Sequence, residues 1–367
     1  MVGAACAWYA ARAGLSVVVV DRGPVAGGTT SAGEGNLLVS DKEPGPELDL
    51  AMLSCRLWRD DVAPALGPAI EYQPKGGLMV TETAAGLDGV ARLAAGQRAA
   101  GIRAVAVPAA ELRSYEPRLA DDLAGGYHYP QDAQVQPMLA AAHLLAAARG
   151  LGAEVRTGER VTGLLRSGDR VVGVRTVRAD LAAGAVVNAA GAWGGELAAL
   201  AGVTVPVLPR RGFILVTEPL PPVIRHKVYA ADYLATVASG VAELQTSAVV
   251  EGTPSGPVLI GASRERVGFD RTLAVPVLRR LAAKAVRLFP VLADVAVIRA
   301  YRGFRPYSPD HLPSIGPDPR APGLVHACGH EGAGIGLAPA TGHLLAQELA
   351  GLTPELDLAP FRPERFG

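Results

Sequence analysis

The chain has 367 residues, of which 49% are hydrophobic and 19% are charged, a balance that excludes a disordered protein. Its 35 basic residues offset its 35 acidic residues, so no net charge favours nucleic acid or an anionic membrane as a partner. The three cysteines are too few and too scattered for a disulfide framework or a zinc site, and no metal is expected. No apolar run is long enough for a membrane span, and no basic segment precedes an apolar run at the N-terminus, so we expect a cytoplasmic protein.

The chain opens with the second half of a dinucleotide-binding βαβ unit. Residues 2–13 are expected to form a helix that begins with small residues, and residues 16–20 a strand buried on both faces. Gly3 stands where the fingerprint G-x-G-x-x-G has its third glycine, and Asp21 where a carboxylate accepts hydrogen bonds from ribose. The strand and the two glycines that open the fingerprint are not in the sequence. A start that lies upstream is the favoured interpretation, and a nucleotide held in an incomplete cradle is the other.

Further nucleotide-binding signals lie in the middle of the chain. The loop 27–36 is dense in glycines and hydroxyls, which suits a pyrophosphate, although a plain glycine–serine turn is the competing interpretation. Residues 137–149 predict a helix, and residues 185–193 a buried strand that ends in glycine. Residues 207–263 alternate apolar and polar positions, which predicts antiparallel sheet, and residues 271–288 predict a helix. Because these signals fall at the start, middle and end, two interleaved domains are expected.

The C-terminal segment is more specific. Residues 303–316 are followed by a glycine-rich stretch, 329–342, that opens a helix ending near Ala350. Glycines before a helix let its free N–H groups approach a ligand, and the helix dipole favours negative charge there. A reduced flavin carries such a charge around N1 and its C2 carbonyl. Arg305 offers a bidentate fork for a carboxylate, and we prefer this role to that of a surface arginine in a proline-rich loop.

Five segments, 17–21, 27–36, 187–193, 303–316 and 329–342, together resemble the FAD-dependent D-amino-acid oxidase family, which includes glycine oxidase, sarcosine oxidase and D-amino-acid dehydrogenases. Residues 33–38 and 261–265 look most like the dehydrogenases, some of which are flavin subunits of opine or D-hydroxyproline dehydrogenase complexes. The resemblance implies an α/β fold in which a Rossmann-like FAD-binding domain is interleaved with an α+β substrate domain built on a largely antiparallel sheet. The expected FAD-binding domain comprises residues 1–65, 131–205 and 302–367, and the substrate domain residues 66–130 and 206–301.

The resemblance also assigns roles to residues. Arg305 would bind the substrate carboxylate, and Tyr229 and Tyr233 would close over the substrate, although ordinary sheet positions explain both tyrosines equally well. No histidine in 28–35 matches the covalent anchor of some relatives, so FAD is expected to be held non-covalently. Gly332 replaces an arginine of glycine-oxidase-like members, which weakens a transfer of their specificity. The residues expected to contact FAD are Val2, Gly3, Asp21, Arg22, Thr29, Thr30, Ser31, Glu34, Gly35, Asn36, Val161, Gly191, His330, Glu331, Gly332, Ala333, Gly334, Ile335 and Gly336.

The function implied is oxidation of the CH–NH bond of a small amino or imino acid by hydride transfer to flavin N5. Candidate substrates are a D-amino acid, glycine or sarcosine, a D-proline-type imino acid, or an opine. The electrons would pass to oxygen, a quinone or a redox partner subunit, with a dehydrogenase favoured, and a homo- or hetero-oligomer stays open. Two other functions stay open: a truncated, non-catalytic flavoprotein or partner-binding subunit, and a nicotinamide-dependent dehydrogenase built on the unit that ends at Asp21. The flavin-like C-terminal segment disfavours the second.

Overall fold

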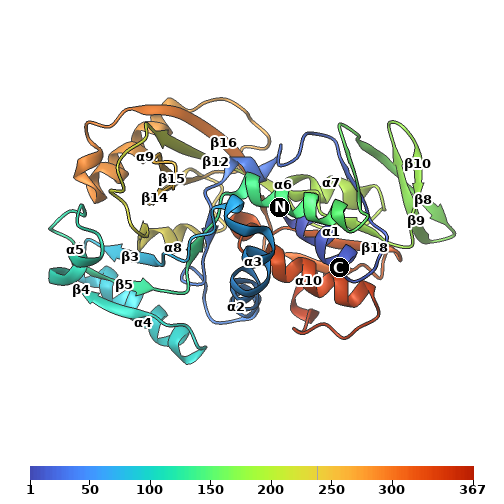
Figure 1. Ribbon diagram of the computed structural model, residues 1–367, viewed down its shortest axis with the longest axis horizontal. Helices are drawn as coiled ribbons and strands as arrows, with labels where there is room; N and C mark the ends of the chain where they lie inside the picture. Colours follow the sequence, from blue (N-terminus) through green and yellow to red (C-terminus); the bar gives the residue numbers. More distant parts are fainter. Residues whose placement is uncertain (238) are drawn as a thin grey trace.

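The computed structural model describes residues 1–237 and 239–367, with the backbone alone described at residues 235–237. Figure 1 shows two lobes side by side, one holding α1, α6, α10 and β18, the other holding a large sheet with α4 and α9. Each lobe is assembled from segments far apart in the sequence. The α/β class and the largely antiparallel second sheet that the sequence predicted are confirmed.

The first lobe consists of short strands, some paired in parallel and some antiparallel, covered by alanine-rich helices. β1 pairs in parallel with β7, and β11 pairs in parallel with β18, which also pairs with β17. A three-stranded antiparallel sheet, β8–β9–β10, lies beside them. The elements are α1 (Val2–Arg12), β1 (Val18–Asp21), α6 (Pro137–Gly150), β7 (Glu154–Thr157), β8 (Val161–Ser167), β9 (Arg170–Thr176), β10 (Asp180–Ala182), β11 (Val186–Asn188), α7 (Gly194–Ala199), β17 (Ser314–Pro317), β18 (Leu324–Cys328) and α10 (Ala338–Leu349).

The second lobe is built on an eight-stranded sheet in the order β16-β12-β15-β14-β13-β3-β5-β4. All neighbours are antiparallel except β13 and β3. The amphipathic helix α9 buries Val277, Leu281 and Ala285 in the same core as β14 and β15. The elements are β3 (Gly77–Thr81), α4 (Ala84–Ala99), β4 (Val105–Pro108), α5 (Leu112–Tyr115), β5 (Gly125–Tyr129), β12 (Leu208–Thr217), β13 (Lys227–Ala230), α8 (Asp232–Val237), β14 (Gln245–Gly252), β15 (Val258–Arg264), α9 (Val275–Leu288) and β16 (Val297–Tyr307). β16 runs past residue 302, where the sequence placed a domain boundary.

The remaining elements connect the two lobes. α2 (Pro46–Leu57) packs on α10, and α3 (Ala63–Leu66) lies near α6. β2 (Asn36–Leu37) pairs with β6 (Ala133–Gln134), which fixes the loop before it. That loop contains a single turn of 3₁₀ helix, Thr29–Ala32. It is the glycine- and hydroxyl-rich loop singled out from the sequence.

Helix α1 packs closely against α10 because both present small residues. A Cβ atom on Gly342 would lie 2.7 Å from the backbone carbon of Ala5, so only glycine permits this approach. On the other side, a Cβ atom on Gly3 would lie 3.2 Å from the Cβ of Ala189, just after β11. Gly3 therefore lets the start of the helix lie against the turn that follows β11.

β1 and β11 each have one edge without a strand neighbour in the described part of the chain, and both strands line the same cavity. The sequence predicted residues 16–20 to be buried on both faces, and this prediction was wrong. Val18 is 49% exposed, and no residue of β1 is fully buried. The β-branched run correctly indicates a strand, but burial depends on neighbours that pair with its second edge.

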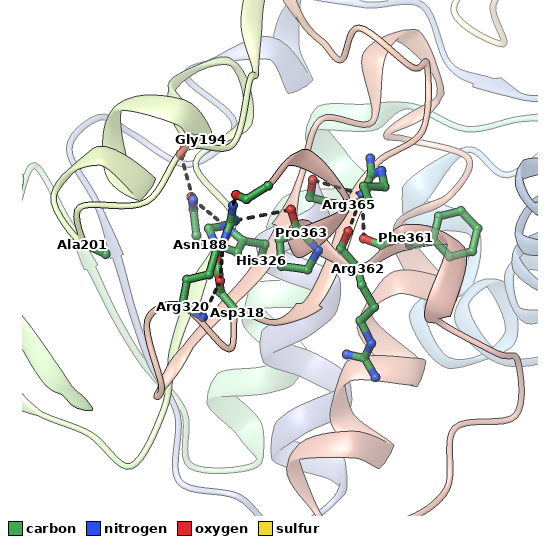
Figure 2. Close-up of polar contacts among 12 residues, drawn as sticks. Asn188, Gly194, Ala201, Asp318, Arg320, His326, Phe361, Arg362, Pro363 and Arg365 are labelled. Atoms are coloured by element: carbon green, nitrogen blue, oxygen red, sulfur yellow. Dashed lines mark hydrogen bonds and ion pairs between the residues drawn. The ribbon is translucent and has the colours of Figure 1, made fainter. Parts of the chain in front are cut away.

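A buried polar network fixes the end of β11, as Figure 2 shows. The Asn188 amide donates to the Gly194 carbonyl over 2.8 Å and lies 3.2 Å from His326 Nδ1. His326 Nε2 lies 3.2 Å from Asp318, which also pairs with Arg320. Because Asn188 donates to Nδ1, the His326 proton is on Nε2 and points at Asp318. This network holds the turn 189–194 that borders the cavity.

Candidate functional site

A cavity of about 2000 Å³ runs through the first lobe and reaches the face of the large sheet. Sites for drug-sized molecules usually measure about 300–1000 Å³, so this cavity has room for a dinucleotide. Of the residues predicted from the sequence, those that line it are Val2, Gly3, Asp21, Arg22, Thr29, Thr30, Glu34, Asn36, Val161, Gly191, Tyr233, Arg305, His330, Glu331, Gly332, Gly334 and Ile335. Ser31, Gly35, Tyr229, Ala333 and Gly336 do not line it.

One end of the cavity lies where β1 ends. Asp21 accepts a hydrogen bond from the Gly23 amide over 2.8 Å, which fixes the orientation of its carboxylate. The neighbouring Arg22 guanidinium lies over the Trp193 ring, 4.0 Å from its centroid. Val161, the first residue of β8, lines the same end. A carboxylate at the end of a parallel strand is the acceptor that an adenosine ribose requires.

The middle of the cavity carries hydrogen-bond donors that suit an anion. The helix α1 has no side-chain cap at its N-terminus, so its first N–H groups and its dipole point at the cavity. The Met1 ammonium donates to the Thr30 hydroxyl over 2.8 Å, and the Thr29 hydroxyl donates to the Phe304 carbonyl over 2.7 Å. These residues could hold a diphosphate.

His330 begins the segment along the other half of the cavity. Its Nε2 lies 3.0 Å from the Thr341 hydroxyl, which itself donates to the Leu337 carbonyl over 2.9 Å. The hydroxyl therefore accepts the proton of Nε2, and the imidazole is neutral with Nδ1 as an acceptor. Burial lowers the pKa of His330 to about 3. Gly334 packs against this ring, because a Cβ atom there would lie 3.3 Å from that of His330.

Arg305 projects from β16 into the far end of the cavity. Its Nη1 donates to the Ser263 carbonyl over 2.8 Å, its one hydrogen bond to the described residues, so the other N–H groups remain available to a ligand. Two glycines make room for the side chain, Gly212 on one side and Gly332 on the other. Burial, and secondly the charge of Arg264, lowers the pKa of Arg305 to about 10, so it stays cationic at neutral pH. The arrangement suits a carboxylate.

A buried ion cluster joins this end of the cavity to the large sheet. Lys227 Nζ on β13 lies 2.6 Å from Glu251 on β14 and 3.6 Å from Glu34, and it also donates to Asn36. Glu251 accepts the Gly35 amide over 3.2 Å. Lys227 and Glu251 are each 1% exposed. Sequence reasoning missed both, because in an alternating strand a charge is read as facing solvent.

The two tyrosines proposed from the resemblance lie in different surroundings. Tyr229 is fully buried, and its hydroxyl bonds to Ser40 in the core between the lobes. Tyr233 lines the cavity, with the Arg264 guanidinium 4.7 Å from its ring centroid. The two rings are 5.6 Å apart and tilted. Tyr233 can therefore contact a ligand directly, whereas Tyr229 can only support it from behind.

Among the residues that the structure describes, no group of three or more histidine, cysteine or acidic side chains is arranged to hold a metal ion. None of the described helices combines the length and the apolar character needed to cross a membrane.

Comparison with known proteins relates the whole chain to one family. Residues 1–348 match the sequence model of the family described as FAD-dependent oxidoreductases. The chain is 38% identical over 259 residues to the hydrogen cyanide synthase subunit HcnC of Pseudomonas aeruginosa, which covers 70% of this chain and 58% of that protein. It is 37% identical over 210 residues to a glycine oxidase of the same organism, covering 57% of this chain and 54% of that protein. The match thus spans little more than half the length of these curated relatives.

The match to one solved structure covers a larger share of both chains. The crystal structure of glycine oxidase from Geobacillus kaustophilus superimposes with a TM-score of 0.88, at 28% identity, over 98% of this chain and 95% of that one. The similarity therefore extends over both lobes.

Proposed function

Because this chain belongs to the family of FAD-dependent oxidoreductases, whose cofactor is FAD, we propose that it oxidises the C–N bond of a small amino or imino acid. The observation that carries this proposal is Arg305, a cation at the end of a dinucleotide-sized cavity with N–H groups that no described residue uses. A guanidinium in this position binds the carboxylate of an amino acid through its planar fork.

The residues of the cavity fit FAD along its length. Asp21 and Val161 would hold the adenosine end, and the start of α1 with Thr29 and Thr30 the diphosphate. The segment 330–335 would lie along the ring system. FAD, when bound without a covalent link, supplies the acceptor for the two electrons and the hydrogen that leave the substrate.

The protein contributes orientation to this reaction. Arg305 pins the carboxylate, and this fixes which face of the substrate α-carbon is turned toward the flavin segment. The hydrogen bond to Ser263 prevents the guanidinium from swinging away. The substrate amine reacts in its neutral form, and the imine product hydrolyses in water, so no side-chain base is required.

The relatives support a small amino acid as the substrate. A glycine oxidase, a hydrogen cyanide synthase subunit and bifunctional ThiO/ThiG proteins are among the relatives. We propose glycine, sarcosine, a D-amino acid, a D-proline-type imino acid or an opine as substrate. Oxygen, a quinone or a redox partner subunit would take the electrons, and the dehydrogenase-like segments 33–38 and 261–265 support one of the latter two.

The test is anaerobic reduction of the purified, FAD-loaded chain. We expect the visible absorption of oxidised flavin, and we expect one of the candidate amino acids to bleach it. Arg305→Ala should lower kcat/KM for that substrate by about 10- to 100-fold, which is the value of a charge-assisted pair. Arg305→Lys should have a kcat/KM between those of the wild type and of Arg305→Ala. Arg299→Ala, an exposed arginine on the same strand, is the control and should change nothing.

The open alternatives predict other results. A non-catalytic flavoprotein would hold FAD that no amino acid bleaches, and a nicotinamide-dependent enzyme would reduce added NAD without flavin absorption. Unchanged turnover in Arg305→Ala would remove this residue from the reaction.

A further inference from the structure

A second arginine stands directly opposite Arg305. Arg210 on β12 and Arg305 on β16 are partners in the antiparallel ladder. Residues paired in this way have Cβ atoms about 4.5–5.5 Å apart on the same face of the sheet. Two like charges in this arrangement destabilise the sheet unless an anion lies between or beside them.

Arg210 lacks a full set of partners. It is completely buried, and its Nη2 donates to the Ser239 carbonyl over 2.8 Å and to Gln245 over 2.9 Å. Its Nε and Nη1 have no hydrogen-bond partner in the described chain. The nearest carboxylate is that of Glu331, 3.6 Å from Nη1, too long for a hydrogen bond. A buried guanidinium with two unused donors is a costly group to leave without a ligand.

Glu331 stands between Arg210 and the cavity. It lines the cavity itself, next to Gly332, which contacts Arg305. Its second oxygen lies 3.0 Å from His311 Nδ1, so the carboxylate has another partner to hold it if it leaves Arg210. Its φ of +46° is a left-handed conformation that non-glycine residues rarely adopt and that is common at ligand sites. The carboxylate is thus weakly attached to Arg210 and replaceable.

Like charges act on both arginines of the pair. Burial and the charge of Arg264 lower the pKa of Arg210 and that of Arg305, while Glu331 opposes this effect at Arg210 and Glu34 opposes it at Arg305. Glu34 already shares Lys227 with Glu251.

We propose that the site takes a substrate with two acid groups, an amino or imino dicarboxylic acid, in which Arg305 binds the carboxylate beside the reacting carbon and Arg210 binds the second one by displacing Glu331. The inference rests on the proposed function for its reaction and on the charge distribution for its substrate class. A monocarboxylic substrate bound to Arg305 would leave the unused donors of Arg210 in place.

The first experiment measures binding without turnover. The FAD-loaded protein is titrated with succinate and with butyrate, which have the same number of carbons but two and one acid groups, and flavin absorption and melting temperature are followed. We expect succinate to bind at least about tenfold more tightly, the value of one added charge-assisted hydrogen bond. Arg210→Gln should abolish the preference, and Glu331→Gln, which removes the competing carboxylate, should increase it.

The control is Arg299→Gln, an exposed arginine on β16, which should leave the succinate-to-butyrate ratio unchanged. Equal affinity for the two probes, or a ratio that neither Arg210→Gln nor Glu331→Gln alters, would overturn the inference. If Arg210→Gln does not fold, the increase in the succinate-to-butyrate affinity ratio that is expected of Glu331→Gln still tests the inference.

A second experiment compares turnover of iminodiacetate with that of sarcosine, which differ by one carboxylate. We expect the higher kcat/KM for iminodiacetate, and the reverse order overturns the inference. The succinate titration measures binding and needs no reaction. If only the proposed oxidation is wrong, turnover is absent but the preference for succinate remains; if only the second acid site is wrong, turnover remains but the preference is absent.

Discussion

Gly212 lies directly beneath the guanidinium of Arg305. A Cβ atom at position 212 would lie 2.1 Å from Arg305 Nη1 and 2.5 Å from the Ser263 carbonyl oxygen. Atoms do not approach so closely, so the path of Arg305 from β16 to Ser263 exists only because residue 212 has no side chain. This glycine acts as a positioning residue for the proposed carboxylate site.

Gly212→Ala should therefore displace Arg305 and weaken its hold on the substrate carboxylate. We expect kcat/KM to fall by about 10- to 100-fold, corresponding to the loss of about 1.5–3 kcal/mol, with most of the change in KM. Steady-state kinetics measure this. Gly150→Ala is the matched control, because a Cβ atom there meets nothing within 4 Å. An unchanged KM in Gly212→Ala would contradict the role.

Lys227→Met should destabilise the fold strongly, because it leaves Glu251 and Glu34 buried without their cation. Removing one partner of a buried pair costs about 3–5 kcal/mol in the free energy of unfolding. Urea unfolding measures it. The double variant Lys227→Met/Glu251→Gln should recover at least half of the loss, since one uncompensated charge is gone. Lys284→Met, at a surface pair, should cost about 1 kcal/mol or less. If Lys227→Met also lowered the free energy of unfolding by only about 1 kcal/mol or less, the cluster would not be ionised.

His330 makes the stability of the cofactor-free chain fall in acid. Its pKa is about 3 in the folded state and about 6.5 when unfolded, so the unfolded chain binds the proton first as the pH drops. The contribution is fully present above pH 6.5 and is lost as the pH falls toward 3. At pH 5 the loss amounts to about 2 kcal/mol. Urea unfolding of wild type and His330→Asn at pH 7.5 and 5 should differ by this amount, and parallel curves would refute it.

Asn188→Ala should loosen the turn beside the cavity, because it removes the donor to Gly194 and leaves His326 Nδ1 without its partner. A buried group left unsatisfied costs about 1–3 kcal/mol. We expect that loss in urea unfolding, together with weaker FAD binding, since Gly191 lines the cavity. Gln131→Ala, an exposed amide, should cost less than about 1 kcal/mol. Full FAD affinity in Asn188→Ala would limit the network to stability.

The sequence predicted those features of the fold and of the candidate site that depend on residues close together in the chain. The glycines and hydroxyls of the loop 27–36 indicated an anion site, and Gly3 packs as the third glycine of the fingerprint does. The motif around Arg305 singled this residue out, and its side chain lines the cavity. Lys227 and Glu251 were not identified from the sequence, because their pairing depends on strand register and on a loop some 190 residues away. The same holds for Arg210, whose partner across the ladder lies 95 residues along the chain.

Among the described residues, β1 and β11 each keep one strand edge unpaired, so we expect the solubility of this protein to depend on its concentration. Unpaired N–H and C=O groups along a strand edge are templates for another chain, and the half-exposed Val18 adds an apolar contact. If two molecules met through these edges they would begin an aggregate, so we expect the loss of soluble protein to rise faster than linearly with concentration. A ligand that fills the adjoining cavity slows this process by lowering the population of molecules whose edges are accessible.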